Sequence, residues 1–264
     1  AEDGTDPDLP SSGEDPVYVM YTSGTTGVPK GTVIRHKSVL RVVRRPVFYP
    51  AGPDDVFLLM SDYSFDGAVY DMFAALTNGA SLVVLDRAEV LDLDRLGTAI
   101  ERHGVTSFFI TATMFHALID NVPERLGSVR RLIFGGEAAS PAHVERAFRL
   151  LGPGRIANGY GPTESPVFAA VHVFDSYDER EAVPIGRPVN DTSLYVLDED
   201  LRLRPIGVPG ELCIGGAGLG DGYLNQPELT AERFVESPDV PGVRLYRTGD
   251  LVTLRSNGLF FYTG

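Results

Sequence analysis

Short apolar runs alternate with helix-like segments over residues 55–158. The runs VFLLMS, SLVVLD, TSFFIT, RRLIFGG and RIANGYG have the length and the β-branched and aromatic content of buried strands. The segments between them begin near Asp66, Asp92, Thr111 and Ser140, and both Asp92 and Ser140 stand where helix N-caps are favoured. This rhythm of strand and helix predicts βαβ units, and therefore a parallel sheet flanked by helices.

The pattern changes after about Asp175. The runs TSLYVLDED, GELCIGG, LYRTGDLVTLR and GLFFYTG are short, strand-like and separated by Gly, Pro and Asn, which predicts an antiparallel sheet or a small barrel. A boundary is expected in PIGRP, between Pro184 and Pro188. The predicted division is an acidic lead-in or linker over residues 1–16, an α/β subdomain over 17–183 and a β-rich subdomain over 184–264.

Composition narrows the possible functions. The 264 residues are 43% hydrophobic, enough for a well-buried core, and the net charge of −13 argues against a general nucleic-acid or anionic-membrane surface. The single cysteine, Cys213, excludes an intrachain disulfide and fits a reducing compartment. We find no secretory signal and no run of 18 apolar residues, so a cytoplasmic protein is expected.

The segment YTSGTTGVPKG, residues 21–31, has the chemistry of a phosphate-binding loop. Its backbone N–H groups and hydroxyls can converge on anionic oxygens, while Lys30 supplies positive charge. The P-loop motif does not fit, because Lys30 follows Pro29 and precedes Gly31, and no G-x-G-x-x-G is present here. Taken alone, the segment is equally typical of a surface turn.

Two further segments offer polar groups that suit a nucleotide. NGYGPTES follows the last predicted parallel strand, where open α/β sheets bind ligands. In it, Tyr160 can stack on a base or pack in the core, and the Thr163 hydroxyl and Glu164 carboxylate suit a phosphate and Mg²⁺. In YRTGDL, the Asp250 carboxylate can accept from ribose hydroxyls, or Asp250 can simply form a turn.

Together these segments resemble the core motifs of the adenylate-forming superfamily. YTSGTTGVPKG, FDGAVYDMF, NGYGPTE, GELCIGGAGLGDGYLNQPELTAERF and YRTGDL follow the order and approximate spacing found in adenylation domains of nonribosomal peptide synthetases. The resemblance covers the chain after Pro16. It implies a flavodoxin-like α/β subdomain followed by a small, barrel-like β-rich subdomain.

The resemblance also implies an activity. Such domains use ATP and Mg²⁺ to convert an amino acid into an aminoacyl adenylate with release of pyrophosphate. They then load the acyl group on the phosphopantetheine thiol of a carrier protein, so the implied partners are carrier protein and neighbouring synthetase domains. Two alternatives are an acyl-CoA or aryl-CoA synthetase fragment and a noncatalytic docking module.

Site residues follow from the same resemblance. Catalytic roles fall to Lys30, Thr163 and Glu164, with Thr163 at the α-phosphate and Glu164 also at the metal. Nucleotide binding falls to Thr22, Ser23, Gly24, Thr25, Thr26, Gly27, Gly135, Gly136, Glu137, Asn158, Gly159, Tyr160 and Asp250.

Asp66 distinguishes the possible substrates. Before a helical run, an Asp is an ordinary N-cap, but the matching Asp of the family binds the α-ammonium of the amino acid. The residues implied around the substrate side chain are Gly67, Tyr70, Phe109, Ile133, Gly135, Gly159, Val167 and Phe168. This apolar set predicts an aliphatic substrate such as valine or isoleucine.

The chain departs from the family pattern in one segment and is shorter than a complete domain of the family. Gly220 and Asp221 stand where the family has Ala-Arg. The family's domain extends beyond this chain on both sides, and its C-terminal lysine would lie beyond Gly264. We therefore expect the chain alone to be inactive or nearly so.

Overall fold

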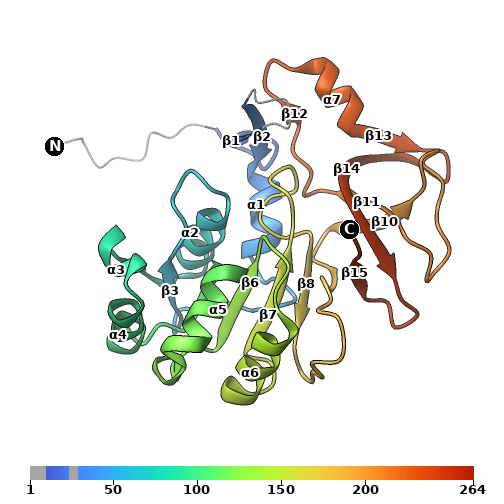
Figure 1. The fold of residues 1–264 in the computed structure, drawn as a ribbon. Helices are drawn as coiled ribbons and strands as arrows, with labels where there is room; N and C mark the ends of the chain where they lie inside the picture. Colours follow the sequence, from blue (N-terminus) through green and yellow to red (C-terminus); the bar gives the residue numbers. More distant parts are fainter. Residues whose placement is uncertain (1–9, 24–28) are drawn as a thin grey trace.

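The computed structural model describes residues 10–23 and 29–264. A seven-stranded sheet forms the centre of the first half (Figure 1), in the order β4-β3-β5-β6-β7-β8-β9. Its strands are β3 (Val56–Leu59), β4 (Ser81–Val84), β5 (Ser107–Thr111), β6 (Arg131–Gly135), β7 (Ile156–Tyr160), β8 (Ala170–Val173) and β9 (Arg187–Pro188). The strands from β4 to β7 are parallel, which confirms the five strands predicted from the apolar runs. β8 pairs antiparallel with β7, and β9 pairs antiparallel with β8.

Helices cover both faces of this sheet (Figure 1). They are α1 (His36–Val43), α2 (Gly67–Asn78), α3 (Arg87–Leu91), α4 (Leu93–His103), α5 (Ala112–Asn121) and α6 (Pro141–Leu151), with a 3-10 turn at Pro123–Leu126. Successive residues of a strand face opposite sides, so Leu132 joins the core under α4, α5 and α6, whereas Ile133 joins the core under α1 and α2.

The predicted helix starts are confirmed. The Asp92 carboxylate accepts from the backbone N–H groups of Asp94 and Arg95 at the start of α4. Ser140 occupies the N-cap of α6, followed by proline, but its side chain makes no capping bond. Asp66 occupies the N-cap of α2, and its side chain also makes no capping bond. The carboxylate of Asp66 is therefore directed elsewhere.

The second half forms an antiparallel sheet in the order β10-β11-β14-β13. Its strands are β10 (Thr192–Leu197), β11 (Gly210–Gly216), β13 (Phe234–Ser237), β14 (Val240–Leu254) and β15 (Phe260–Tyr262). One edge of β14 pairs with β11, and its other edge pairs first with β13 and then with β15. Because β10 stays at the edge of this sheet, the described residues form no closed barrel, and the barrel-like expectation is corrected to an open sheet. The division between residues 183 and 184 stays a prediction.

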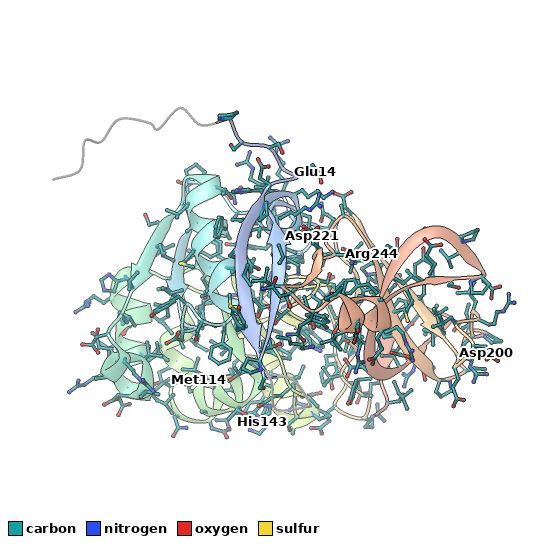
Figure 2. All side chains as sticks on the ribbon, turned by 90° about the horizontal axis from the view of Figure 1, so that it is seen from above. Glu14, Met114, His143, Asp200, Asp221 and Arg244 are labelled. Atoms are coloured by element: carbon teal, nitrogen blue, oxygen red, sulfur yellow. The ribbon has the colours of Figure 1, made fainter. Side chains whose placement is uncertain are left out.

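A third, three-stranded sheet links the two halves. The hairpin of β1 (Pro16–Thr22) and β2 (Lys30–Arg35) pairs with β12 (Gly222–Tyr223), which precedes α7 (Pro227–Arg233). Asp221, at the family departure, accepts from Arg35 Nε at 2.6 Å, and its carbonyl accepts from Arg244 at 2.7 Å. In the view from above, Asp221 and Arg244 lie between the hairpin and the second sheet (Figure 2). The carboxylate of Asp221 is therefore paired with the guanidinium of Arg35.

None of the helices in the described part of the chain is both long and apolar enough to cross a membrane.

Candidate functional site

Two adjoining cavities open at the carboxyl ends of the parallel strands. The first, here called the Asp66 cavity, has a volume of about 370 Å³, and the second, here called the Asp250 cavity, has a volume of about 600 Å³. Gly136, Gly159 and Gly161 line both. The two cavities therefore adjoin along a wall that includes three glycines.

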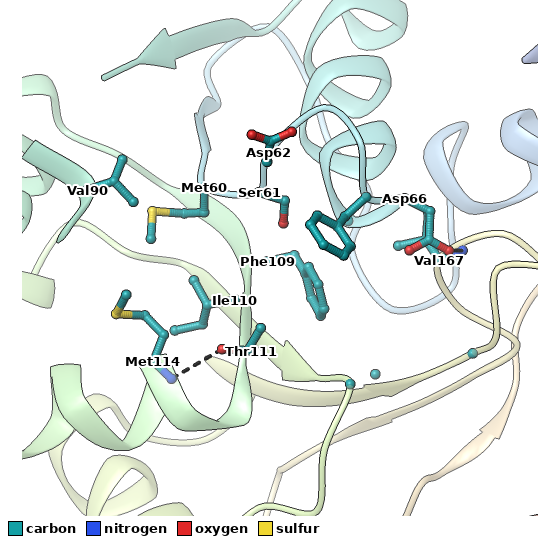
Figure 3. Close-up of a pocket in the computed structure, with 15 residues that line it drawn as sticks. Met60, Ser61, Asp62, Asp66, Val90, Phe109, Ile110, Thr111, Met114 and Val167 are labelled. Carbon is teal, nitrogen blue, oxygen red and sulfur yellow. Dashed lines mark hydrogen bonds between the residues drawn. The ribbon is translucent and has the colours of Figure 1, made fainter. Parts of the chain in front are cut away.

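Asp66 lines its cavity, beside Val167 (Figure 3). Its Oδ2 accepts from the Val167 backbone N–H at 3.2 Å. Burial raises the pKa of the Asp66 carboxyl and the charge of Glu164 adds to this, while bonds from Val167 and Thr163 partly offset it. A cationic group bound at Asp66 would relieve this unfavourable burial of negative charge.

The rest of the Asp66 cavity is mostly apolar. Phe109 lies at its centre, with Met60, Val90 and Met114 on the far side from Asp66 (Figure 3). Gly67 is required by close packing, because a Cβ there would lie 2.6 Å from Ser61 Oγ and 2.9 Å from the Phe109 ring. The cavity therefore offers the Asp66 carboxylate at one end, the exposed Asp62 carboxylate elsewhere on its lining, and mostly apolar surface between them.

Four residues expected at the substrate line neither cavity: Gly135, described below, and three larger residues buried one layer behind this wall. Tyr70, Ile133 and Phe168 are each at most 1% exposed and line neither cavity. The Phe168 ring packs edge-on against Tyr70 and Phe109, with centroids 5.2 and 5.4 Å away. Phe168 therefore supports the wall through Phe109, which is a lining residue.

The Asp250 cavity brings together residues expected at a nucleotide. Gly136, Glu137, Asn158, Gly159, Tyr160 and Asp250 all line it. The Tyr160 hydroxyl donates to Asp250 Oδ2 at 2.5 Å, and the Asn158 amide donates to the Pro184 carbonyl at 2.9 Å. Gly135 lies behind the lining, where a Cβ would meet the Gly159 carbonyl oxygen at 2.1 Å.

Lys30 and Glu164 form an ion pair. Lys30 Nζ lies 2.7 Å from Glu164 Oε1, and the same oxygen accepts from the Tyr223 hydroxyl at 2.5 Å. Burial alone would raise the pKa of Glu164, but the bonds from Lys30 and Tyr223 outweigh burial and lower it. Burial alone would lower the pKa of Lys30, and the same partners raise it overall. Both groups are therefore charged at neutral pH.

The hairpin places the remaining loop residues that the structure describes. Thr22 ends β1 directly opposite Lys30 in the register of β2, and Ser23 follows it at an exposed position. Gly24, Thr25, Thr26 and Gly27 lie outside the described residues.

Tyr223, Met60 and Met114 contribute to the site without having been predicted there. Tyr223 lies within the quoted segment GYLNQPELT, but no local pattern shows that its hydroxyl reaches Glu164. Met60 lies in the predicted strand VFLLMS and Met114 in the helix predicted to begin near Thr111, and their place in the cavity depends on how these elements pack. Only the repeated apolar character at strand ends could have marked the two methionines.

Together the groups suit a ligand with several chemical parts. The Asp66 cavity can hold a cation attached to an apolar group. The Asp250 carboxylate can accept from hydroxyls, and Lys30 can bind an anionic oxygen near Glu164. The two cavities therefore suit a cationic, apolar part and a hydroxyl-bearing part, and Lys30 suits an anionic part.

Comparison with known proteins shows the family of the chain. The family model described as AMP-binding enzyme matches residues 1–224. Bacitracin synthase 1 of Bacillus licheniformis is 46% identical over 251 residues, covering 95% of this chain and 5% of that protein. Surfactin synthase subunit 3 of Bacillus subtilis (strain 168) is 41% identical over 264 residues, covering 100% of this chain and 21% of that protein.

Solved structures give the same result. Holo-PA1221, described as a nonribosomal peptide synthetase protein containing adenylation and PCP domains bound to a vinylsulfonamide inhibitor, matches 98% of this chain and 46% of its own, with TM-score 0.88 and 34% identity. The NpsA N-terminal subdomain of Klebsiella oxytoca, in complex with 3-hydroxyanthranilyl-AMSN, matches 100% of this chain and 68% of its own, with TM-score 0.87 and 29% identity. The chain thus spans a small part of its curated relatives and about half of PA1221.

Proposed function

The chain belongs to the AMP-binding enzyme family, among the adenylation domains of nonribosomal peptide synthetases, and from this premise we propose that it selects and activates an amino acid. In the proposed reaction, the amino-acid carboxylate attacks the α-phosphate of ATP to form an aminoacyl adenylate and release pyrophosphate. The acyl group then passes to the phosphopantetheine thiol of a carrier protein.

The Asp66 carboxylate carries the proposal. Asp62 also lines the cavity, but it is exposed and accepts from Ser64, whereas Asp66 is largely buried in a mostly apolar cavity that adjoins the Asp250 cavity through shared glycines. A charge-assisted contact with an α-ammonium is commonly worth about 1.5–3 kcal/mol. Such a contact would favour an amino acid over the same acid without its amine, and so separates this proposal from a synthetase for simple acyl or aryl acids.

The proposed side chain is aliphatic, similar to that of valine or isoleucine. Phe109 and Val167 line the Asp66 cavity, and the second carboxylate of its lining, Asp62, is exposed. A buried wall of this kind disfavours a charged side chain strongly. It separates substrates that differ by one methylene by only about 1–3 kcal/mol.

The residues around Glu164 fit Mg²⁺ that is shared with substrate phosphates. Mg²⁺ usually binds through one or two carboxylates plus phosphate oxygens and water. In the described residues Glu164 is a single ionised carboxylate beside Lys30, and no group of three or more potential metal ligands occurs. Glu164 would hold the ion, which supplies charge neutralisation at the phosphates, and Lys30 would contact an anionic oxygen.

Further features complete the proposal. Tyr160 and Asp250 would hold the adenosine, and Thr163 would contact the α-phosphate. Partner carrier and synthetase domains are proposed because PA1221 contains a PCP domain beside its adenylation domain. A cytoplasmic location is proposed because the reaction consumes ATP.

Calorimetric titration with non-hydrolysable aminoacyl-adenylate analogues tests the proposal. The valyl and isoleucyl analogues should bind at least tenfold more tightly than the glutamyl and lysyl analogues. Asp66→Asn should weaken the valyl analogue about 10- to 100-fold, in line with the loss of a charge-assisted contact, and should leave AMP affinity unchanged. Tighter binding of a charged analogue, or equal loss of AMP affinity, would contradict the assignment.

A further inference from the structure

Arg41 is a buried cation outside the site described above. It lies on α1 and is 4% exposed. In the described part of the chain no carboxylate lies within ion-pair distance of its guanidinium. Burying an uncompensated charge is costly, so the guanidinium must be held by strong hydrogen bonds.

Those bonds converge on one loop behind the Asp66 cavity. Arg41 donates to Ser165 Oγ and to the Phe168 carbonyl oxygen, each at 2.8 Å. A third bond, also of 2.8 Å, reaches Thr192 Oγ1 at the start of β10. The two loop contacts lie on either side of Val167.

Val167 has an unfavourable backbone conformation. Its φ is 62°, and Phe168 N donates to the Pro166 carbonyl oxygen at 2.8 Å, which closes a three-residue turn around it. Positive φ is rare for a β-branched residue, and turns of this kind are strained. Such a conformation persists only where surrounding contacts hold it.

This turn directs the Val167 N–H at the Asp66 carboxylate, 3.2 Å away. We propose that Arg41 is a positioning residue that holds the turn at Val167, so that Asp66 is fixed in the orientation that binds the substrate ammonium. Arg41 lines neither cavity and acts through its bonds to Ser165 and Phe168.

Gly218 is part of the same arrangement. A Cβ at Gly218 would lie 1.9 Å from Arg41 Nε and 2.3 Å from Cζ. Only glycine leaves room for the guanidinium at this position, and Gly218→Ala should displace Arg41 without removing its charge.

The inference rests on the proposed function. Two measurements distinguish a failure of the role proposed for Arg41 from a failure of the proposed function. The first is amide hydrogen exchange at Val167 in the ligand-free chain, which reports the bond to Asp66. The second is the ratio of affinities for a valyl-adenylate analogue and its isovaleryl counterpart, which lacks the amine.

The variants are Arg41→Met, Gly218→Ala, and Arg41→Met combined with Val167→Gly, since glycine adopts positive φ without strain. Arg44→Met is the control, because Arg44 is exposed at the end of the same helix and its bond is to Thr77.

We expect wild type and Arg44→Met to prefer the valyl analogue at least tenfold. Arg41→Met and Gly218→Ala should lower this preference to about threefold or less and speed Val167 exchange at least tenfold. Val167→Gly should restore the preference in the Arg41→Met background.

The role of Arg41 would be overturned if Arg41→Met lost affinity equally for both analogues while amide exchange at Val167 stayed slow. It would also be overturned if Val167→Gly failed to restore the preference in the Arg41→Met background. No preference in wild type would overturn the proposed function, while the exchange rates would still decide whether Arg41 holds the turn. If Arg41→Met does not fold, Gly218→Ala gives the same two readouts.

Discussion

At the scale of single residues, Glu164 shows how a buried charge is kept stable beside the cavities. Its side chain is 4% exposed, and both of its partners, Lys30 and Tyr223, act on the same oxygen. Tyr223 is itself held in place by packing against Phe234 and lies under the Lys30 ammonium. The three groups therefore form one unit that joins the hairpin, the loop between β7 and β8, and β12.

Removing the Tyr223 hydroxyl tests this unit. Tyr223→Phe takes a donor from a buried carboxylate, and should lower the free energy of unfolding by about 1–3 kcal/mol. It should also weaken the binding of Mg²⁺-ATP several-fold, because Glu164 loses part of its orientation. Urea unfolding and calorimetry measure these effects. Tyr63→Phe is the matched control, since Tyr63 is 81% exposed. An equal cost for the two variants would refute the assigned role of Tyr223.

At the scale of elements, the two large sheets meet at Gly186. Its carbonyl accepts from Phe260 N at 3.0 Å, which joins the end of the first sheet to β15. The φ of Gly186 is 102°, and a Cβ there would lie 2.2 Å from the Val171 carbonyl carbon. Neither the backbone conformation nor the space admits a side chain.

Gly186→Ala should therefore loosen the junction between the sheets. We expect the free energy of unfolding to fall by about 2–4 kcal/mol, combining backbone strain with overpacking. Gly52→Ala is the control, because nothing lies within 4 Å of a Cβ at Gly52. Chemical denaturation of the two variants measures the difference, and a Gly186→Ala variant as stable as Gly52→Ala would show that the junction tolerates a side chain.

The elements that the sequence predicts correctly are those with a local signal. The five parallel strands are continuous apolar runs, and Asp92 caps α4 through its own neighbours. The two-residue strand β12 carries no such signal, because it exists only through pairing with β2, almost two hundred residues earlier. The antiparallel return of β8 likewise depends on the loop that precedes it.

In the candidate site, too, only the residues with a local signal could be predicted from the sequence. Motif chemistry predicts roles for Lys30, Glu164, Asp66 and Asp250. In the structure Asp66 and Asp250 line two adjoining cavities, and Lys30 and Glu164 form an ion pair. Whether an apolar residue lines a cavity or lies behind it is a matter of packing. Phe168 is fully buried for this reason, and no periodicity distinguishes it from Phe109.

At the scale of the whole molecule, acid should destabilise the fold in part through His172. Burial lowers the pKa of His172 to about 4. Unfolded His has a pKa near 6.5, so between these values the unfolded chain binds more protons, and stability is lost as pH falls from about 6.5 to 4.

The contribution of His172 is expected to be about 1–2 kcal/mol between pH 7.5 and 4.5, after allowance for its partial exposure. His172→Gln should remove this part of the pH dependence, whereas His103→Gln, at an exposed helix end, should keep it. Urea unfolding at both pH values measures the change. Identical pH dependence in His172→Gln and wild type would show that His172 is not the group responsible.

The central claim is that the two cavities hold one ligand, an aminoacyl adenylate. A crystal structure of the chain with a non-hydrolysable valyl-adenylate analogue tests it most directly. We expect the ammonium nitrogen within hydrogen-bond distance of Asp66, the side chain against Phe109, and the ribose hydroxyls at Asp250, with the linkage passing Gly136 and Gly159. An analogue whose ammonium points away from Asp66, or whose adenosine lies outside the Asp250 cavity, would refute the proposed function.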